Sequence, residues 1–216
     1  MKSIPQVLPV RLEKKRPGIV MPFFSAIIVG AAGAGLIFLG THLTEVKGAW
    51  LMAAFGVIAA LLGVVMLWSC FYQLLMRGIP LPIVELSSET ITLGKPARIA
   101  LIQPGPVALR GLRVEIVCLE RHITWKQRVP DEHGHREAFS TVDEKRAHIE
   151  PVIDAPEVQV STGDVWQQTR EFTLPATGQP SKTSNRLDVI WQIEVTGRGG
   201  PLTKFLHEFV IDVRRG

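Results

Sequence analysis

The sequence predicts an α+β membrane protein in which a helical hairpin that crosses a membrane twice precedes an all-β antiparallel sandwich. Two observations support this prediction. Two long apolar runs stand near the N-terminus, and the residues after them alternate between apolar and polar with a period of two, which is typical of strands with one buried face. At 216 residues, the chain suffices for one ordinary domain and a small membrane anchor.

The apolar runs cover residues 18–40 and 48–76, and between Gly18 and Met76 the only charged residues are Glu45 and Lys47. A span needs about 20 apolar residues, and backbone groups in lipid must be satisfied within their own segment. The first run is longer than the roughly 7–15 apolar residues of a signal peptide, and a second run follows it directly. A retained hairpin of two membrane-spanning helices is therefore expected over residues 18–77.

The distribution of basic residues predicts the orientation of the hairpin. The tail before the first run, residues 1–17, is basic through Arg11, Lys14, Lys15 and Arg16, whereas the loop between the runs holds a single lysine. Lys and Arg favour the cytoplasmic side, so the N-terminus and the β domain are expected in the cytoplasm. A second interpretation of the tail is a site for anionic lipid headgroups, at about 1 kcal/mol per base.

Small residues recur at four-residue spacing in both apolar runs. They include Ala26, Gly30 and Ala34 in the first run and Gly56, Ala60 and Gly63 in the second, where Gly63 pairs with Ala59. Such patterns let helix backbones approach closely. Packing within this hairpin and docking to another membrane protein both remain open. Neither run has an ionisable residue deep inside it, which argues against transport by this chain alone.

Charge and cysteine usage exclude two further classes. The net charge of +4 arises mainly in the tail, because 17 basic and 18 acidic residues nearly cancel over residues 78–216. A nucleic-acid-binding domain would carry its excess charge on the folded part, so no nucleic-acid partner is expected. Cys70 lies in the second apolar run and Cys118 in a predicted strand, so no disulfide is expected.

The β-sandwich is predicted over residues 78–216. Candidate strands cover residues 83–86, 90–93, 97–102, 112–118, 152–160, 165–174, 189–195 and 205–213. Turn signals separate them, and seven to nine short strands with turns between them predict an antiparallel sandwich. Trp191 is expected in its core, because its neighbours of the same parity are apolar, while Trp125 and Trp166 are alternatives for a binding face.

Residues 127–147 interrupt the strand pattern with a run of mixed charge. They are predicted to form a long solvated loop or an extended hairpin, and loops of this length tend to be functional or disordered. The charged residues that are candidates for contact with a partner are Asp131, Glu132, Arg136 and Glu137.

The search for chemistry predicts neither a metal nor a cofactor. His133 and His135 are the best metal candidates, with Asp131, Glu132 and His148 nearby in sequence, but zinc needs three or four converging ligands and two histidines in a charged loop are usually solvated. The sequence has no Walker, Rossmann, G-x-S-x-G or H-E-x-x-H motif. The chain is therefore not expected to be an enzyme.

The C-terminal strands resemble the closing strands of arrestin-like β-sandwiches. The resemblance rests on Glu171-Phe172-Thr173-Leu174-Pro175, on Pro180-Ser181, on the strand Leu187–Val195 with its tryptophan, and on Phe209–Val213. The turn Leu93–Pro96 and the strand Leu112–Arg121 are also similar to bacterial membrane proteins of unknown function that join two N-terminal spans to such a sandwich.

That resemblance covers roughly residues 80–214. It implies an arrestin-like or immunoglobulin-like sandwich that serves as a binding scaffold without catalysis, held in a bacterial inner membrane. The phosphate-sensing polar core of true arrestins has no counterpart that we can assign in this sequence.

Three functions are compared. The leading hypothesis is a membrane-anchored, non-catalytic interaction module, such as an adaptor, assembly factor or accessory subunit, with the lipid bilayer and a protein in or at the membrane as partners. The alternative is a lipid-binding or sensing module at the membrane surface, suggested by the basic tail together with the charged segment 127–147. The third is a metal-dependent enzyme centred on His133 and His135. No oligomeric state is predicted.

Overall fold

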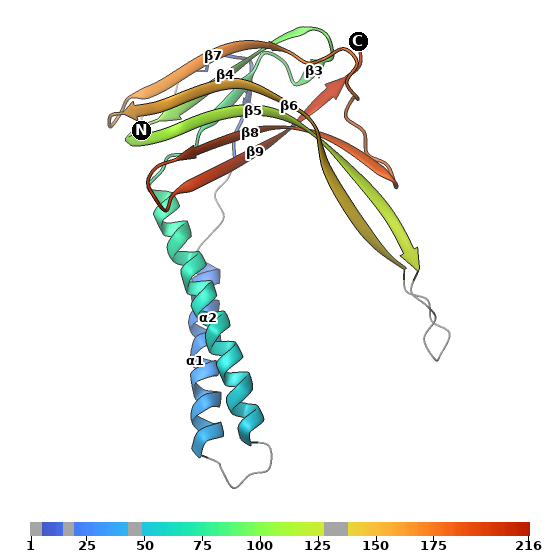
Figure 1. Ribbon diagram of the computed structural model, residues 1–216. Helices are drawn as coiled ribbons and strands as arrows, with labels where there is room; N and C mark the ends of the chain where they lie inside the picture. The colour runs from blue at the N-terminus through green and yellow to red at the C-terminus, as the bar shows by residue number, and fades with distance from the viewer. Residues whose placement is uncertain (1–5, 15–19, 43–48, 128–137) are drawn as a thin grey trace. The chain divides into compact units, whose positions relative to one another are not determined.

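The computed structural model describes residues 6–14, 20–42, 49–127 and 138–216. The chain forms two compact units: residues 15–79 make up a helical hairpin, and residues 1–14 together with 80–216 make up a β domain. The chain therefore leaves the β domain before the first helix and returns to it after the second. Figure 1 labels α1, α2 and the strands β3 to β9.

The hairpin unit contains α1, Val20–His42, and α2, Ala49–Arg77. Both helices are long and apolar enough to cross a membrane, with a mean hydropathy of 2.1 over Pro22–His42 and 2.5 over Ala49–Arg77. At about 1.5 Å per residue, each exceeds the roughly 30 Å of a hydrocarbon core. The two predicted helices are confirmed as helices, with ends shifted by one or two residues.

The two helices pack along a seam of small residues spaced seven apart. The buried positions are Ala26, Gly33 and Gly40 in α1 and Ala49, Gly56, Gly63 and Cys70 in α2. A Cβ added to Gly33 would lie 2.5 Å from the backbone nitrogen of Ala60, so no side chain fits there. A seven-residue repeat is the period that keeps one face of each helix against the other in a left-handed supercoil.

The predicted four-residue pattern selects only part of this seam. Gly30 lies beneath Gly63, since a Cβ on Gly63 would be 2.8 Å from the Gly30 Cα. Ala34, by contrast, is exposed, and the pattern missed Gly33 and Gly40. Residues spaced four apart move progressively around the helix away from the contact face. A step of three residues followed by a step of four, seven in all, returns to the same face.

The β domain is built from two sheets with strand orders β1-β2-β4-β7 and β3-β9-β8-β5-β6. The strands are β1 Val10–Leu12, β2 Ile83–Leu86, β3 Thr90–Thr92, β4 Pro96–Pro104, β5 Val107–Gln127, β6 Ala138–Val160, β7 Val165–Thr173, β8 Leu187–Arg198 and β9 Lys204–Arg214. The predicted antiparallel arrangement is confirmed for every pair of these strands except β3 and β9, which are parallel.

Inward-facing apolar side chains from both sheets form the core. The largest fully buried ones are Trp191, Leu86, Ile91, Ile99, Leu101, Ile102, Leu109, Leu112, Ile116, Ile153, Leu174 and Ile193. The indole N–H of Trp191 donates to the Gln179 carbonyl oxygen at 2.8 Å, so the buried ring leaves no polar atom unsatisfied. The core position predicted for Trp191 is confirmed.

One segment differs from its prediction, and a second matches one of its two predicted alternatives, the extended hairpin. Residues 1–17 were expected to be a tail, but Val10–Leu12 forms β1 and pairs with β2. Residues 127–147 were expected to be a loop or an extended hairpin. Of these, Ala138–Ala147 belongs to β6 and pairs with β5, while residues 128–137 lie outside the described part of the chain.

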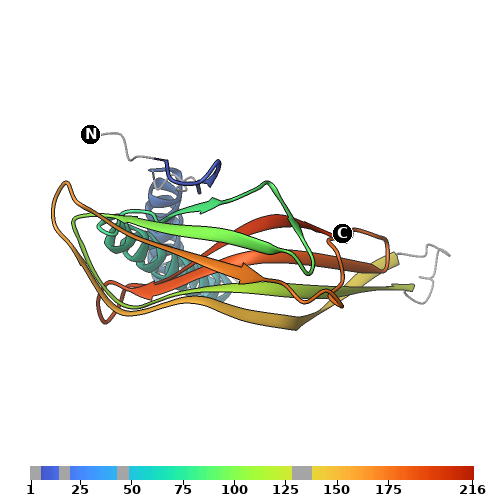
Figure 2. The ribbon, with the colours of Figure 1, turned by 90° about the horizontal axis from the view of Figure 1, so that it is seen from above.

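The two ends of the β domain differ in construction. The β4–β5, β6–β7 and β8–β9 turns lie at the same end of the β domain. The chain enters the β domain from α2 at this end, and there Gln103 Nε2 donates a hydrogen bond to the Pro80 carbonyl oxygen at 2.9 Å. We call this the junction end. At the other end, β5 pairs with β6 alone beyond His122, which forms a two-stranded arm. Figure 2 shows the arm and the β8–β9 turn at opposite ends.

The seam predicts an asymmetry between two glycines. Gly56→Leu should destabilise the hairpin by about 1–3 kcal/mol through overpacking, because a Cβ at Gly56 would lie 2.7 Å from the backbone nitrogen of Ile37. Thermal unfolding in mild detergent, followed by the exposure of the buried Cys70 thiol to a fluorogenic maleimide, measures the effect. Gly35→Leu is the matched control, since a Cβ there meets nothing within 4 Å. Equal midpoints for the two variants would contradict the seam.

Candidate functional site

One buried carboxylate fixes the N-terminal segment to the edge of the smaller sheet. Glu85 in β2 is 0% exposed. Its Oε2 accepts hydrogen bonds from the backbone amides of Val7 at 2.7 Å and Leu8 at 2.8 Å, and its Oε1 accepts from Arg11 Nε at 2.8 Å. Arg11 Nη2 also lies 2.7 Å from Oε1. We call this arrangement of Glu85, Arg11 and the two amides the carboxylate clamp.

The clamp favours the ionised form of Glu85. Burial is the largest single influence and raises the pKa of Glu85. The amides of Leu8 and Val7 and the Arg11 guanidinium lower the pKa, and their combined effect exceeds that of burial, so the pKa lies below 4.5. Glu85 is therefore charged at neutral pH, and its hydrogen bonds are of the stronger, charge-assisted kind.

The clamp joins the segments on either side of the hairpin. β1 precedes α1 and β2 follows α2, and the two strands pair with Val10 opposite Leu86 and Leu12 opposite Val84. Arg11, a predicted topology or headgroup residue, has its guanidinium bound by Glu85. Lys14 is exposed, and Lys15 and Arg16 lie outside the described residues.

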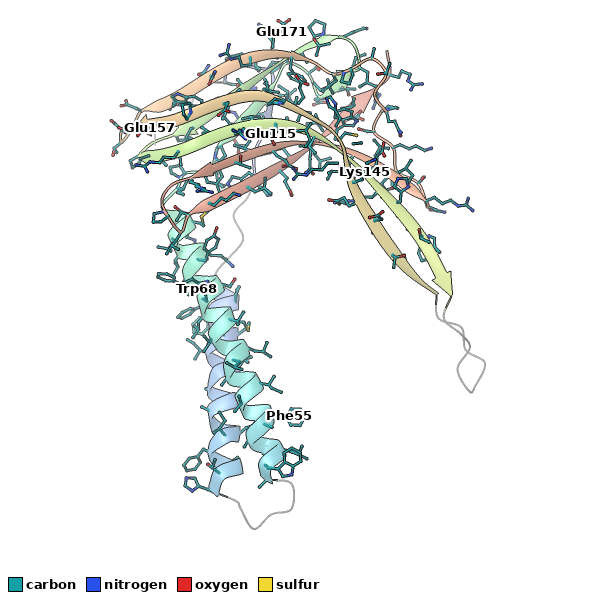
Figure 3. The ribbon with its side chains drawn as sticks, viewed as in Figure 1. Phe55, Trp68, Glu115, Lys145, Glu157 and Glu171 are labelled. Atoms are coloured by element: carbon teal, nitrogen blue, oxygen red, sulfur yellow. The ribbon has the colours of Figure 1, made fainter. Side chains whose placement is uncertain are left out.

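The face of the larger sheet that points away from the core carries side chains in rows, which the register of β5, β8 and β9 sets. Glu115, Glu194 and Glu208 stand directly opposite one another and form a glutamate row. Like charges in this position are destabilising. Figure 3 labels Glu115 in the middle of this sheet.

Two arginines and an amide offset the repulsion within the glutamate row. Glu194 is 3% exposed, and its two carboxylate oxygens accept from Arg146 Nη2 at 3.2 and 3.1 Å. Gln192 Nε2 also donates to Glu194 Oε1 at 2.8 Å. Arg113 lies 3.9 Å from Glu115. Glu208 in β9 is exposed, so the glutamate row presents negative charge to solvent.

Beside the glutamate row, the same face is apolar. Ile149, Val117, Gln192 and Val210 occupy the next register positions across β6, β5, β8 and β9. Val210 is 69% exposed and Ile149 46%. In the arm, alternation continues this face through Val142 to Trp125, which is 62% exposed and donates its indole N–H to the Asn185 carbonyl oxygen at 3.2 Å.

Most exposed large apolar residues of the β domain gather on this face. Across its described residues they are Val7, Trp125, Val142, Ile149, Val165, Leu202, Leu206 and Val210. Trp125, Val142, Ile149, Leu206 and Val210 share the outer face of the larger sheet and its arm. A gathered apolar patch with a charged border marks an interaction site more often than scattered residues do. We call it the outer face.

The histidines and cysteines do not assemble a reactive centre in the part of the chain that the structure describes. No group of three or more His, Cys, Asp or Glu there could hold a metal ion, and the metal candidates His133 and His135 lie outside it. His148 packs 5.8 Å from the Trp191 ring. Burial, and secondarily Glu120, raise the pKa of Cys118 to about 11, so its thiol is protonated at neutral pH and is a poor nucleophile.

The predicted partner residues Asp131, Glu132, Arg136 and Glu137 connect β5 to β6 and lie outside the described residues. The carboxylate clamp and the outer face were not predicted. Alternation in β8 and β9 was the available signal for the outer face, since it places Gln192, Glu194, Glu208 and Val210 opposite the core positions.

The fold of the chain is similar to that of solved protein structures. The chain is similar to the sporulation control protein Spo0M from Bacillus subtilis, with 17% sequence identity and a TM-score of 0.42 over 63% of this chain. The match spans 50% of that protein's length. No family model matches the sequence, and no curated protein does.

The clamp predicts a pH dependence. Because the pKa of Glu85 is lower in the folded protein than its ordinary value of 4.5, its contribution to stability is complete above about pH 4.5 and is lost as pH falls through the folded value. Hydrogen–deuterium exchange of residues 6–14 should therefore accelerate on acidification toward pH 3, after correction for intrinsic exchange rates.

Glu85→Gln should remove this pH response and cost about 1.5–3 kcal/mol at pH 7, the range for hydrogen bonds to a charged group. Glu171→Gln, at an exposed position of β7, is the matched control and should behave like the unchanged protein. If Glu85→Gln left the exchange of residues 6–14 unaltered at both pH values, the clamp would not hold this segment.

Proposed function

We propose that this protein is a membrane-anchored, non-catalytic interaction module whose outer face binds a protein partner at the cytoplasmic membrane surface. The helical hairpin is the anchor, the carboxylate clamp joins the anchor to the β domain at both ends, and the outer face makes the contact. An adaptor, assembly factor or accessory subunit of a membrane complex has this organisation.

The side chains of the hairpin support the anchoring role. Outside the glycine seam, both helices expose large apolar residues around their circumference, including Phe55 and Val64, and Figure 3 shows Phe55 and Trp68 projecting from α2. Trp50 and Trp68 are both exposed and 18 residues apart, which is about 27 Å along a helix and close to the spacing of the two membrane interfaces.

The clamp supports the proposed topology. A hairpin that crosses the membrane twice returns the chain to the side from which it came, and pairing between β1 and β2 requires this. The surplus of basic residues before α1, compared with the single lysine between the helices, then favours the cytoplasm for the β domain.

The exposed side chains of the outer face support the proposal of a protein partner. Val210 in β9 and Ile149 in β6 are exposed on a sheet face whose border is the acidic row containing Glu115 and Glu208. Desolvation of this apolar patch would drive association at about 25 cal/mol per Å² of buried apolar surface. The complementary partner presents apolar side chains bordered by Lys or Arg, with the charges setting its register.

Photo-crosslinking in native membranes tests this proposal. Benzoylphenylalanine replaces Val210 or Ile149 on the outer face, and Val165, exposed on β7 of the other sheet, is the matched control position. We expect one repeatable cross-linked protein from positions 210 and 149 and none from 165. In addition, Val210→Asp should reduce recovery of that protein at least tenfold, whereas Val165→Asp should not.

Three results would contradict the proposal. No cross-link from any position would remove the protein partner, and equal cross-links from all three positions would indicate random collision. A cross-linked species composed of two copies of this chain would replace a separate partner with self-association.

A further inference from the structure

A second surface stands at the junction end of the β domain, on the same side of the larger sheet and one row beyond Leu206, the residue of the outer face nearest this end. Arg110 in β5 is directly opposite Arg198 in β8, and Arg198 is directly opposite Lys204 in β9. Neighbouring strands are about 4.8 Å apart, so three cationic side chains start within about 10 Å of one another. We call them the basic row.

Two members of the basic row, Arg110 and Arg198, differ from the other arginines of this face in their electrostatic environment. Arg113, the next basic residue along β5, lies 3.1 Å from Asp154. Across the described residues, no ion pair or side-chain hydrogen bond reaches Arg110 or Arg198. Cations directly opposite each other repel, so this arrangement is destabilising by itself and becomes favourable when an anion binds between the side chains.

Two acidic residues lie nearby and do not cancel the row. Glu157 in β6 is opposite Arg110, and its Oε1 accepts a hydrogen bond from Gln159 Nε2 at 2.9 Å. Asp164 lies in the β6–β7 turn, with its backbone bonded to Ser161 and Gly105. Figure 3 labels Glu157 at this end of the sheet. Within this row, Arg110 and Arg198 outnumber Glu157, which leaves an excess of positive charge.

The surface around the basic row is hollowed. Arg110, Arg113, Arg198 and Lys204, with Gly111, Thr196 and Gly197, line a hollow of about 340 Å³. Gly111 has a φ of +60° and lies where the register between β5 and β8 shifts. This glycine bulge leaves open space between Arg110 and Arg113, because a Cβ on Gly111 would meet nothing within 4 Å.

An exposed apolar residue stands beside the cations. Leu202, in the β8–β9 turn between Arg198 and Lys204, is 58% exposed. Basic side chains flanking an exposed leucine are typical of surfaces that enter the headgroup region of an anionic membrane. The chain between the end of α2 and Pro80, which is bonded to Gln103 at the junction end, consists of Gly78 and Ile79.

From these observations we infer that the basic row binds the phosphate of an anionic lipid headgroup, with Leu202 entering the adjoining interface. The inference rests on the proposed membrane anchor, because a two-residue connection keeps the junction end close to the bilayer only if α2 spans it. It assigns a lipid contact to Arg110, Arg198 and Lys204 in the β domain.

Native mass spectrometry of the full-length protein in detergent tests the inference. The probes are short-chain phosphatidylglycerol, short-chain phosphatidylcholine and inorganic phosphate. Phosphatidylglycerol should bind at least tenfold more tightly than phosphatidylcholine. Arg110→Gln/Arg198→Gln should weaken phosphatidylglycerol binding by roughly 30-fold, the change expected for losing two bases near an anionic headgroup.

The matched control is Lys182→Gln/Arg186→Gln, which removes two exposed basic residues before β8 at the arm end of the domain and should leave binding within twofold. Equal affinity of the Arg110/Arg198 variant and the unchanged protein would overturn the inference. Inorganic phosphate that competes as well as phosphatidylglycerol would overturn its assignment to lipid.

Extraction separates this inference from the proposed anchor. Membranes containing the full-length protein are washed with alkaline carbonate, which releases peripheral proteins. Release of the protein would contradict the anchor and the inference with it. Retention, combined with unchanged phosphatidylglycerol binding by the Arg110/Arg198 variant, would overturn the headgroup site alone.

Discussion

The structure depends on a buried charge that is satisfied from a distant part of the chain. Glu85 can be fully buried because the amides of Val7 and Leu8 and the guanidinium of Arg11 meet its carboxylate. This interaction adds the edge strand β1 to the smaller sheet, so the chain segments before and after the hairpin both belong to the β domain. The proposed anchor is therefore connected to the β domain by two chain segments.

The hairpin and the β domain are stabilised by two different kinds of packing. In the hairpin, glycines spaced seven apart allow backbone contact between α1 and α2, which is how helices associate where lipid leaves little hydrophobic driving force between them. In the β domain, burial of side chains such as Trp191 and Ile116 provides that force. The β domain leaves two surfaces unmatched: the apolar outer face with its glutamates, and the basic row at the junction end.

The sequence predicted both helices and eight of the nine strands, because strong apolar content and period-two alternation are local signals. β1 was missed because three residues carry no periodicity, and its partner Glu85 is 74 positions from Arg11. For the arm, the sequence predicted either a loop or an extended hairpin, because Asp143, Glu144, Lys145 and Arg146 are exposed and lack alternation. The rows of the outer face depend on register, which alternation within one strand does not determine.

The most direct test determines on which side of the membrane three single cysteines lie. Each cysteine is introduced into a Cys70→Ser/Cys118→Ser background. It is then labelled with an impermeant maleimide in sealed vesicles of known orientation. The three cysteines replace Glu13 after β1, Asn185 before β8 and His42 at the end of α1. We expect positions 13 and 185 to label together from the cytoplasmic side and position 42 from the opposite side. Labelling of positions 13 and 185 from opposite sides would contradict this expectation, since β1 and β2 could not then pair.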